Sequence, residues 1–209
     1  MKILLPTTAF PRFEKDYVAE FIIDNIKRIN AEFLAIAPRD LMSKQYENIT
    51  NNIAINRFYY FLPKYQKLAY GGGIGINLEK NYMAKLQIPF LGLSFVNAIS
   101  KRLDNIDLIH AQMVFAGYCS HLARKITNKK IPLIVSFFGR DILNCEQNLN
   151  IYKGMLKETD LFLALSKNMV YRLIKMGCSP KKIIIHHLGI DTKRFGYKVP
   201  SKSKTKLRF

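Results

Sequence analysis

The chain has few cysteines and no long apolar run. Its three cysteines, Cys119, Cys145 and Cys178, lie far apart and form no CxxC pair, so the spacing of a zinc site or a disulfide framework is absent. We expect reduced thiols, as in a cytosolic protein. The apolar run Ile3–Leu5 is far shorter than a signal-peptide core, and no stretch reaches the roughly 18 apolar residues of a membrane span. The sequence therefore predicts a cytoplasmic protein with no membrane-crossing segment.

Acidic residues are also scarce, with 15 Asp and Glu against 33 Lys and Arg, which gives a formal net charge of +18. Such an imbalance concerns partners and not the fold. Nucleic acid, an anionic membrane surface and phosphorylated small molecules would all suit it. Coding bias is an alternative source, because the chain is rich in Lys, Asn and Ile. Apolar residues make up 49% of the chain, which is enough for a real core and excludes a disordered chain.

The usual phosphate and metal motifs are missing. The run Gly71–Gly75 fails the dinucleotide pattern, because Leu78 stands where a further glycine is required, and no Gly-Lys-Ser/Thr follows it. We interpret this run as a flexible connection between two helical pieces. His186 and His187 are adjacent, so on a strand they would point to opposite faces. With no HxH, HExxH or DxD pattern, we predict no protein-held metal and no cofactor.

Short apolar runs alternate with helical patterns along nearly the whole chain. Strands are predicted at Ile3–Leu5, Glu32–Ala37, Asp107–Ala111, Leu133–Phe137, Leu161–Leu165 and Ile183–Ile185, with a further extended stretch at Ile53–Phe61. Helices are predicted from Asp16 and at Phe90–Leu103, Val114–Thr127 and Asn148–Glu158. Tyr70–Asn77, with four glycines, is expected to lack regular structure. The alternation predicts an α/β fold, a Rossmann-like doubly wound parallel sheet with helices on both faces.

The last third of the chain is the most informative. Leu161–Leu165 is a wholly apolar run, as expected of a buried parallel strand. Ser166 follows at once and can cap the next helix, Gly177 would end that helix, and Pro180 lies just beyond it. One face of this helix is apolar: Met169, Val170, Leu173 and Ile174. The segment predicts a strand, a helix, a loop and a second strand.

This segment, Leu161–Phe195, closely resembles the end of the first domain of GT-B glycosyltransferases of family 4. Those chains typically run Ser, a helix, Gly, a Pro-containing loop, a strand, then Gly-Val-Asp and a Phe. The matching residues here are Ser166, Gly177, Pro180, Gly189, Asp191 and Phe195. The resemblance implies one half of a GT-B architecture, with residues 1–197 as the N-terminal, Rossmann-like, acceptor-side domain. Residues 198–209 would be an interdomain linker and the start of a C-terminal domain that is absent.

In this family the second domain carries most of the nucleotide-sugar site, with a basic pair for the diphosphate and a Glu-x7-Glu pattern. The resemblance therefore implies that a nucleotide-sugar binds only together with the missing domain, and that the chain is inactive without it. A fragment, a truncated reading frame and one subunit of a split enzyme all fit the sequence.

The resemblance also suggests site residues at the loops that follow the strands. Phe10-Pro11-Arg12 resembles the first loop of one group in the family, where Arg12 could meet a phosphate; the alternative is a plain surface arginine. The stretch Asp107–Gln112 resembles the motif Asp-Val-Ile-His-Ala-His, with the second His replaced by Gln112. His110 stands near the end of its strand, where a side chain can point into a ligand crevice.

Ser136–Asp141 resembles the family's His-Gly-x-Asp loop, which faces the reaction site. Gly139 and Asp141 match, but Phe138 replaces the His, so a role for Phe138 is limited to shape or stacking. Asp141 is expected to hydrogen-bond the sugar acceptor or to cap a helix, and to face the same crevice as His110. The residues predicted to bind acceptor or substrate are Arg12, His110, Phe138, Gly139, Asp141 and Ser166. The sequence identifies no catalytic residue.

The resemblance implies the acceptor-side half of a retaining glycosyltransferase. Such an enzyme would transfer sugar from a nucleotide-sugar to a surface-polysaccharide or lipopolysaccharide acceptor. The alternative is a non-catalytic basic module that binds an anionic polymer, either nucleic acid or a membrane surface. No RNP, KH or zinc-finger motif is present, so no nucleic-acid partner is expected.

A sugar or lipid-linked acceptor would place the protein on the inner face of the plasma membrane. That leaflet is negatively charged and attracts basic residues. The segment Arg57–Lys67 mixes aromatic with basic residues, so Arg57, Lys64 and Lys67 are predicted to contact the membrane. The alternative is that its aromatic side chains belong to the core.

Overall fold

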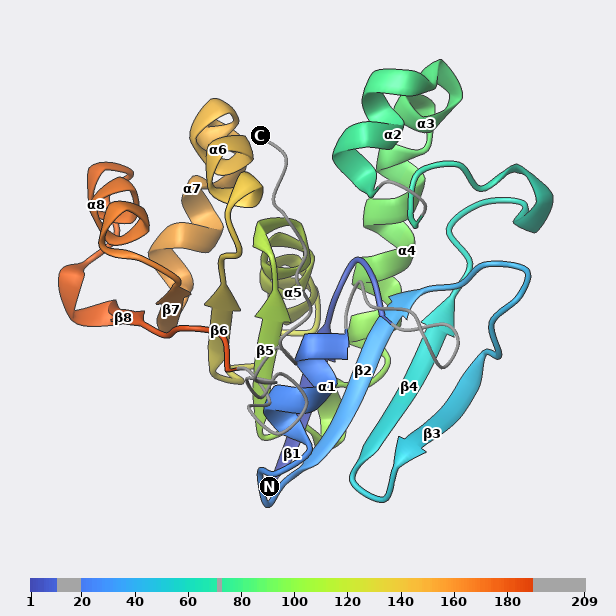
Figure 1. The fold of residues 1–209 in the computed structure, drawn as a ribbon, viewed down its shortest axis with the longest axis horizontal. Coiled ribbons are helices and arrows are strands. Elements are labelled where there is room, and N and C mark those ends of the chain that lie inside the picture. The colour runs from blue at the N-terminus through green and yellow to red at the C-terminus, as the bar shows by residue number, and fades with distance from the viewer. Residues whose placement is uncertain (11–19, 71–72, 190–209) are drawn as a thin grey trace, which may run out of the picture.

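The computed structural model describes residues 1–10, 20–70 and 73–189, and within them the chain forms an eight-stranded sheet with the order β3-β4-β2-β1-β5-β6-β7-β8 (Figure 1). The strands are β1 (Lys2–Pro6), β2 (Glu32–Pro38), β3 (Tyr46–Thr50), β4 (Ile53–Phe58), β5 (Leu108–Gln112), β6 (Leu133–Ser136), β7 (Leu161–Ala164) and β8 (Ile183–Ile185). Every neighbouring pair is parallel except β3 and β4. The strand order reverses direction beside β1, as in a doubly wound fold.

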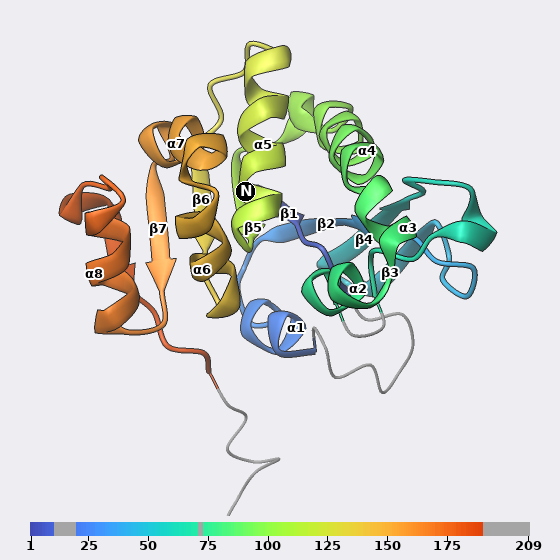
Figure 2. The ribbon, with the colours of Figure 1, turned by 90° about the horizontal axis from the view of Figure 1, so that it is seen from above.

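Helices lie on both faces of this sheet (Figure 2). They are α1 (Glu20–Ile26), α2 (Ile74–Lys80), α3 (Tyr82–Leu86), α4 (Ile88–Ser100), α5 (Val114–Ile126), α6 (Arg140–Gln147), α7 (Leu149–Glu158) and α8 (Lys167–Lys175), with short 3-10 turns η1 (Pro63–Tyr65), η2 (Leu103–Asn105) and η3 (Pro180–Lys182). Ile22 and Ile26 of α1 pack with Ile3 and Leu5 on one face. The larger core, with α4, α5 and α7, lies on the other face. The predicted α/β, Rossmann-like fold is confirmed.

The alternation of side chains along the strands fills both cores. In β5, Ile109 and Ala111 are fully buried in the larger core, so His110 and Gln112 point to the opposite face. The same period holds in β1, where Leu4 belongs to the larger core and Ile3 and Leu5 to the smaller one. These strands therefore contribute side chains to both faces of the sheet.

Both predicted ends of the helix after β7 are confirmed. Ser166 accepts a hydrogen bond at Oγ from the Met169 amide, 3.3 Å away, and so caps α8. Gly177 adopts φ 93°, in the left-handed region that favours glycine. The Cys178 amide then donates to the Leu173 carbonyl at 3.0 Å and closes the turn.

The prediction that Tyr70–Asn77 lacks regular structure is wrong in its second half, because α2 begins at Ile74. Gly73 precedes the helix with φ 86°, so a glycine here serves as the entry to a helix. The Asn77 side-chain amide donates to the carbonyls of Leu68 and Tyr70, at 2.9 and 2.7 Å. These bonds tie the helix to the preceding segment.

None of the helices in the described parts of the chain is both long and apolar enough to cross a bilayer. The three cysteines are free thiols, and all three are buried. Burial raises the pKa of Cys145 to about 12 and that of Cys178 to about 11, so these thiols stay protonated near neutral pH.

Candidate functional site

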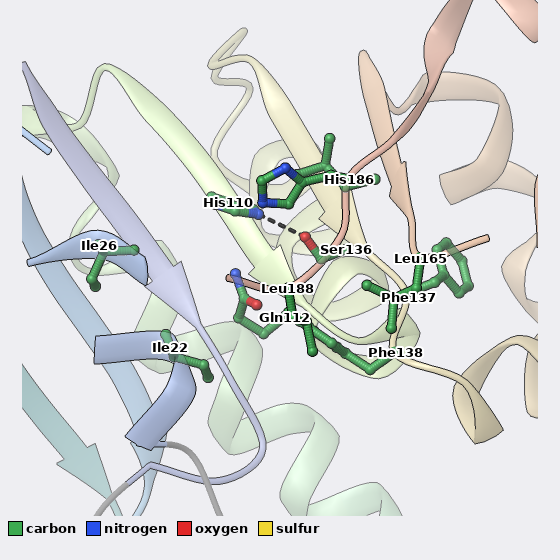
Figure 3. Close-up of a pocket in the computed structure, with 11 residues that line it drawn as sticks. Ile22, Ile26, His110, Gln112, Ser136, Phe137, Phe138, Leu165, His186 and Leu188 are labelled. Atoms are coloured by element: carbon green, nitrogen blue, oxygen red, sulfur yellow. Dashed lines mark hydrogen bonds between the residues drawn. The ribbon is translucent and has the colours of Figure 1, made fainter. Parts of the chain in front are cut away.

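A cavity of about 50 Å³ lies where β5, β6 and β7 end (Figure 3). Polar groups from β5, β6 and the segment after β8 line it, together with apolar groups from the loops and α1. They include His110, Gln112, Ser136, Phe138, Leu165 and His186. Gln112 and Ser136 are register partners across β5 and β6. The carboxyl edge of a parallel sheet is where such folds bind ligands, so this cavity is the candidate site.

His110 and Ser136 form the polar centre of the cavity, with 2.8 Å between His110 Nε2 and Ser136 Oγ (Figure 3). Burial, and to a smaller extent the proximity of His186, lowers the pKa of His110 to about 4. The imidazole is therefore neutral near pH 7. A neutral ring can donate from one nitrogen and accept at the other. It can therefore donate a hydrogen bond to a hydroxyl group or accept one from it.

The turn between β5 and α5 is strained. Met113 has φ 74°, a left-handed conformation that is uncommon for a non-glycine residue. Its amide donates to the Ser136 carbonyl at 2.9 Å, and Thr8 Oγ1 lies 3.4 Å from its sulfur. Backbone strain of this kind gathers at functional sites. Met113 was not among the residues predicted from the sequence.

Asp141 organises the loop between β6 and α6. Its Oδ1 accepts hydrogen bonds from the amides of Phe138 and Gly139, at 3.0 and 2.8 Å. Gly139 has φ 136°, which only glycine adopts readily. Burial raises the pKa of the Asp141 carboxyl, and its Oδ2 is buried with no partner among the described residues. Asp141 thus fixes the loop that carries Phe138, whereas the N-cap of α6 is Gly139 and no side chain caps the helix.

His110 lies in β5, and Asp141 follows the neighbouring strand β6 at the same edge of the sheet. They differ in exposure to the cavity, because His110 and Phe138 line it whereas Asp141 and Gly139 do not. Ser166 follows β7 beside the lining residue Leu165 and caps α8. Arg12 lies outside the described residues.

Sequence reasoning gave no role to two groups that the structure brings to the cavity. Ser136 is the hydrogen-bond partner of His110, and only the register of β5 with β6 could have revealed it. His186 is positioned by its amide, which donates to the Ala164 carbonyl at 2.9 Å. The sequence could have indicated His186 by its position, because it directly follows the predicted strand Ile183–Ile185.

The membrane role predicted for Arg57 is wrong. Arg57 is 1% exposed, and its guanidinium donates to the Lys44 carbonyl and to Glu47 Oε2, at 3.1 and 2.9 Å. Its position in β4 turns the side chain inward beside the buried Ile55, so the charge is used to join β4 to β3. Lys64 and Lys67, by contrast, are exposed on and beside η1.

No group of three or more His, Cys, Asp or Glu side chains in the described ranges is placed to hold a metal ion. The chemistry available at the cavity is therefore hydrogen bonding by His110, Ser136 and Gln112 against an apolar wall. Such a wall with a few polar groups is typical of sites for small organic ligands.

Known proteins resemble this chain in sequence and in fold. The family model of Glycosyltransferase Family 4 matches residues 56–194. The amylovoran biosynthesis glycosyltransferase AmsK of Erwinia amylovora is 26% identical over 220 residues, which cover 95% of this chain and 53% of AmsK. The chain thus spans about half the length of this curated relative.

Two solved structures illustrate the likeness in fold. A sucrose-phosphate synthase chain from Thermosynechococcus elongatus gives a TM-score of 0.61 at 12% identity, with 93% of each chain covered. HepE of Anabaena, solved in complex with UDP and glucose, gives a TM-score of 0.58 at 17% identity, with 92% of this chain and 46% of HepE covered. The chain therefore belongs to Glycosyltransferase Family 4 and has the fold of the N-terminal domain of its GT-B enzymes.

Proposed function

We propose that this chain forms the acceptor-side half of a retaining glycosyltransferase that adds a sugar to a surface-polysaccharide or lipopolysaccharide acceptor. The observation that carries the proposal is the neutral His110–Ser136 pair in a cavity at the carboxyl edge of the sheet, within a family 4 chain. The name of AmsK, which places that relative in polysaccharide biosynthesis, supports the acceptor class.

The residues divide into those that would touch the sugar acceptor and those that would position them. His110 would hydrogen-bond an acceptor hydroxyl, and Phe138 would cover the apolar face of a sugar ring. Asp141 and Gly139 would act by holding the loop that carries Phe138. Ser166 would contact the acceptor from its position after β7. Arg12 would bind a phosphate of the acceptor.

The size of the cavity limits what it would hold. About 50 Å³ is room for a few water-sized groups, so the cavity would take the hydroxyl-bearing edge of a sugar while the rest of the ring stayed at the mouth. A pocket that binds one polar edge discriminates among sugars by their hydroxyl positions, because unmatched buried groups carry a free-energy cost.

The donor would be a nucleotide-sugar bound mainly by a second domain, as the resemblance to family 4 enzymes implies; HepE, of which this fold covers 46%, was solved with UDP and glucose. The leaving diphosphate would be stabilised electrostatically by groups of that second domain. We expect transfer only when both halves are present. The alternative of a non-catalytic basic module is supported by the net charge of +18 alone.

A reconstituted transfer assay tests the proposal. The chain is combined with a separately expressed donor-side domain of a family 4 enzyme and supplied with UDP-sugars and saccharide acceptors. His110→Asn and Phe138→Ala should raise the KM for the acceptor and leave the KM for the donor unchanged. Tyr171→Ala, at an exposed position of α8, is the matched control. Variants that change only the donor KM would contradict the assignment of this half.

A further inference from the structure

A second cavity lies beyond the carboxyl ends of β2 and β4, between the β2–β3 loop and η1. Its volume is about 240 Å³, and it shares no lining residue with the candidate cavity at β5–β7. The two segments that enclose it run side by side in Figure 1. A hydrogen bond of 2.8 Å from the Gln66 side chain to the Arg39 carbonyl joins them. The cavity is therefore a separate site whose two walls are tied together.

Hydrogen bonds within the protein hold both walls of this cavity in place. In the β2–β3 loop, Asp40 Oδ1 accepts from the amides of Met42 and Ser43, at 3.1 and 2.9 Å. Arg39 Nε donates to the Ser43 carbonyl at 3.0 Å. Beside η1, the Gln66 side chain accepts from the Tyr60 amide at 3.0 Å. The cavity is thus preformed, and a preformed site spares its ligand the cost of ordering the walls.

The lining of this cavity has an excess of positive charge. Arg39, Lys64 and Lys67 line it, and Asp40 is the one acidic residue among the described residues that do so. Three cations against one carboxylate leave a formal charge of +2. Within the described ranges, neither lysine nor either Nη atom of Arg39 has a carboxylate partner. These cations are therefore available to an anionic ligand.

Tyr60, which also lines the cavity, supplies a buried hydrogen-bond donor. The residue is 4% exposed, and its phenolic oxygen accepts from the amides of Leu68 and Ala69, both at 3.0 Å. Burial raises the pKa of the phenol, so the hydroxyl group keeps its proton near neutral pH. That proton has no acceptor among the described residues. A buried donor without an acceptor carries a free-energy cost, which an oxyanion bound in the cavity would remove.

We propose that this cavity binds a small phosphate monoester of the sugar phosphate class. A monoester dianion matches the formal charge of +2, and its three terminal oxygens match the donors of Arg39, the two lysines and Tyr60. A volume of about 240 Å³ equals that of roughly eight water molecules, which is more than one phosphate group fills. Pro63 and Tyr70 also line the cavity, and their apolar faces can cover the organic part of the ester. The inference is independent of sugar transfer, because it concerns binding at a separate cavity.

Isothermal titration calorimetry of the 209-residue chain at constant ionic strength tests this assignment. Glucose 1-phosphate should bind saturably, inorganic phosphate should bind more weakly because it leaves the apolar wall uncovered, and glucose should not bind. Lys64→Gln with Lys67→Gln should lower the affinity for glucose 1-phosphate about 10- to 100-fold, the range expected when charge-assisted hydrogen bonds are removed. The matched control, Lys153→Gln with Lys157→Gln, removes the same charge from exposed positions of α7 and should bind as the unaltered chain does.

Two further variants separate hydrogen-bond geometry from charge. Arg39→Lys keeps the charge but removes the planar fork of donors, and Tyr60→Phe removes only the hydroxyl group. Each should weaken binding about tenfold, and circular dichroism checks that every variant is folded. The proposal is overturned if glucose 1-phosphate does not bind, or if glucose or inorganic phosphate binds equally well. It is also overturned if the α7 control pair weakens binding as much as the lysine pair at η1. Binding to phosphatidylglycerol vesicles without binding to glucose 1-phosphate would assign the cavity to a lipid headgroup and would overturn it as well.

Discussion

At the scale of single residues, the candidate site depends on two titratable groups whose pKa values are shifted by burial. His110 is neutral because its surroundings cannot solvate an imidazolium. The same cause raises the pKa of Asp141, while the amides of Phe138 and Gly139 act in the opposite direction. Both groups are thus tied to the stability of the fold as well as to the site.

The shifted pKa of His110 predicts a pH-dependent stability. An unfolded histidine titrates near 6.5, whereas folded His110 titrates near 4. Between these values the unfolded chain binds a proton that the folded chain does not, so the free energy of unfolding falls as the pH falls. The loss should reach about 3 kcal/mol near pH 4, measured by urea unfolding at several pH values.

Two variants isolate this contribution. His110→Gln should flatten the slope of unfolding free energy against pH within that window. Ser136→Ala should keep the slope, because burial and not the hydrogen bond is the main cause of the shift. An unchanged slope in His110→Gln would mean that another group carries the pH dependence.

Asp141 provides a second prediction at this scale. Asp141→Ala removes the acceptor for two loop amides and should lower the free energy of unfolding by about 1–3 kcal/mol, the usual cost of leaving hydrogen-bond donors without their acceptor. Asp141→Asn keeps an oxygen at that place and should lose less. Urea unfolding near neutral pH measures both, and equal losses in the two variants would show that the charge, not the accepting oxygen, stabilises the loop.

At the scale of elements, the position of α5 depends on the absence of a side chain. A Cβ on Gly117 would lie 2.9 Å from Val135 Cγ2, closer than real Cβ atoms approach. Helix α5 therefore sits directly on β6, and the β5–α5 turn that carries Met113 follows from its placement.

Gly117→Ala should lower the free energy of unfolding by about 1–3 kcal/mol, because the added methyl group overpacks the core. Gly154→Ala in α7 is the matched control. A Cβ there would meet His121 Nε2 at an ordinary 3.4 Å, and alanine favours the helix by up to about 1 kcal/mol. Thermal unfolding of both variants checks the contrast. A neutral Gly117→Ala would show that α5 can move away from β6 at no cost.

The elements that could be predicted from the sequence are those with their own local signal. The apolar runs of β1, β2, β5, β6, β7 and β8 and the caps of α8 were found within a residue or two. Strand β3 was missed because it is an exposed, antiparallel edge without an apolar run. Helix α2 was missed because its glycines suggested a loop, and β4 ends at Phe58 rather than at Phe61.

Residues of the candidate site differ in the same way: some have a local signal in the sequence, and others do not. His110 and Phe138, which were predicted from family motifs near the ends of strands, line the cavity. Ser136 was missed because its role depends on the register of two strands, and Arg57 was misassigned because a sequence does not show that Glu47 will lie beside it. Pairings between strands are fixed by the whole sheet, so local patterns predict the elements better than their contacts.

At the scale of the whole molecule, the chain spans 53% of AmsK, and its two notable surfaces differ in kind. The cavity at β5–β7 is small and mostly apolar with one polar pair, which suits a sugar edge. The cavity between the β2–β3 loop and η1 is basic, because Arg39, Lys64 and Lys67 line it.

The central claim is that this chain recognises the sugar acceptor and leaves the nucleotide-sugar to a second domain. NMR titration of the isotopically labelled 209-residue chain tests it most directly, with an acceptor saccharide and a UDP-sugar added separately. The account predicts that the saccharide shifts the resonances of His110 and the Phe138–Asp141 loop, whereas the UDP-sugar causes no saturable change and is not turned over. Tight binding of the UDP-sugar, or transfer by the chain alone at about 1 per second or faster, would contradict it.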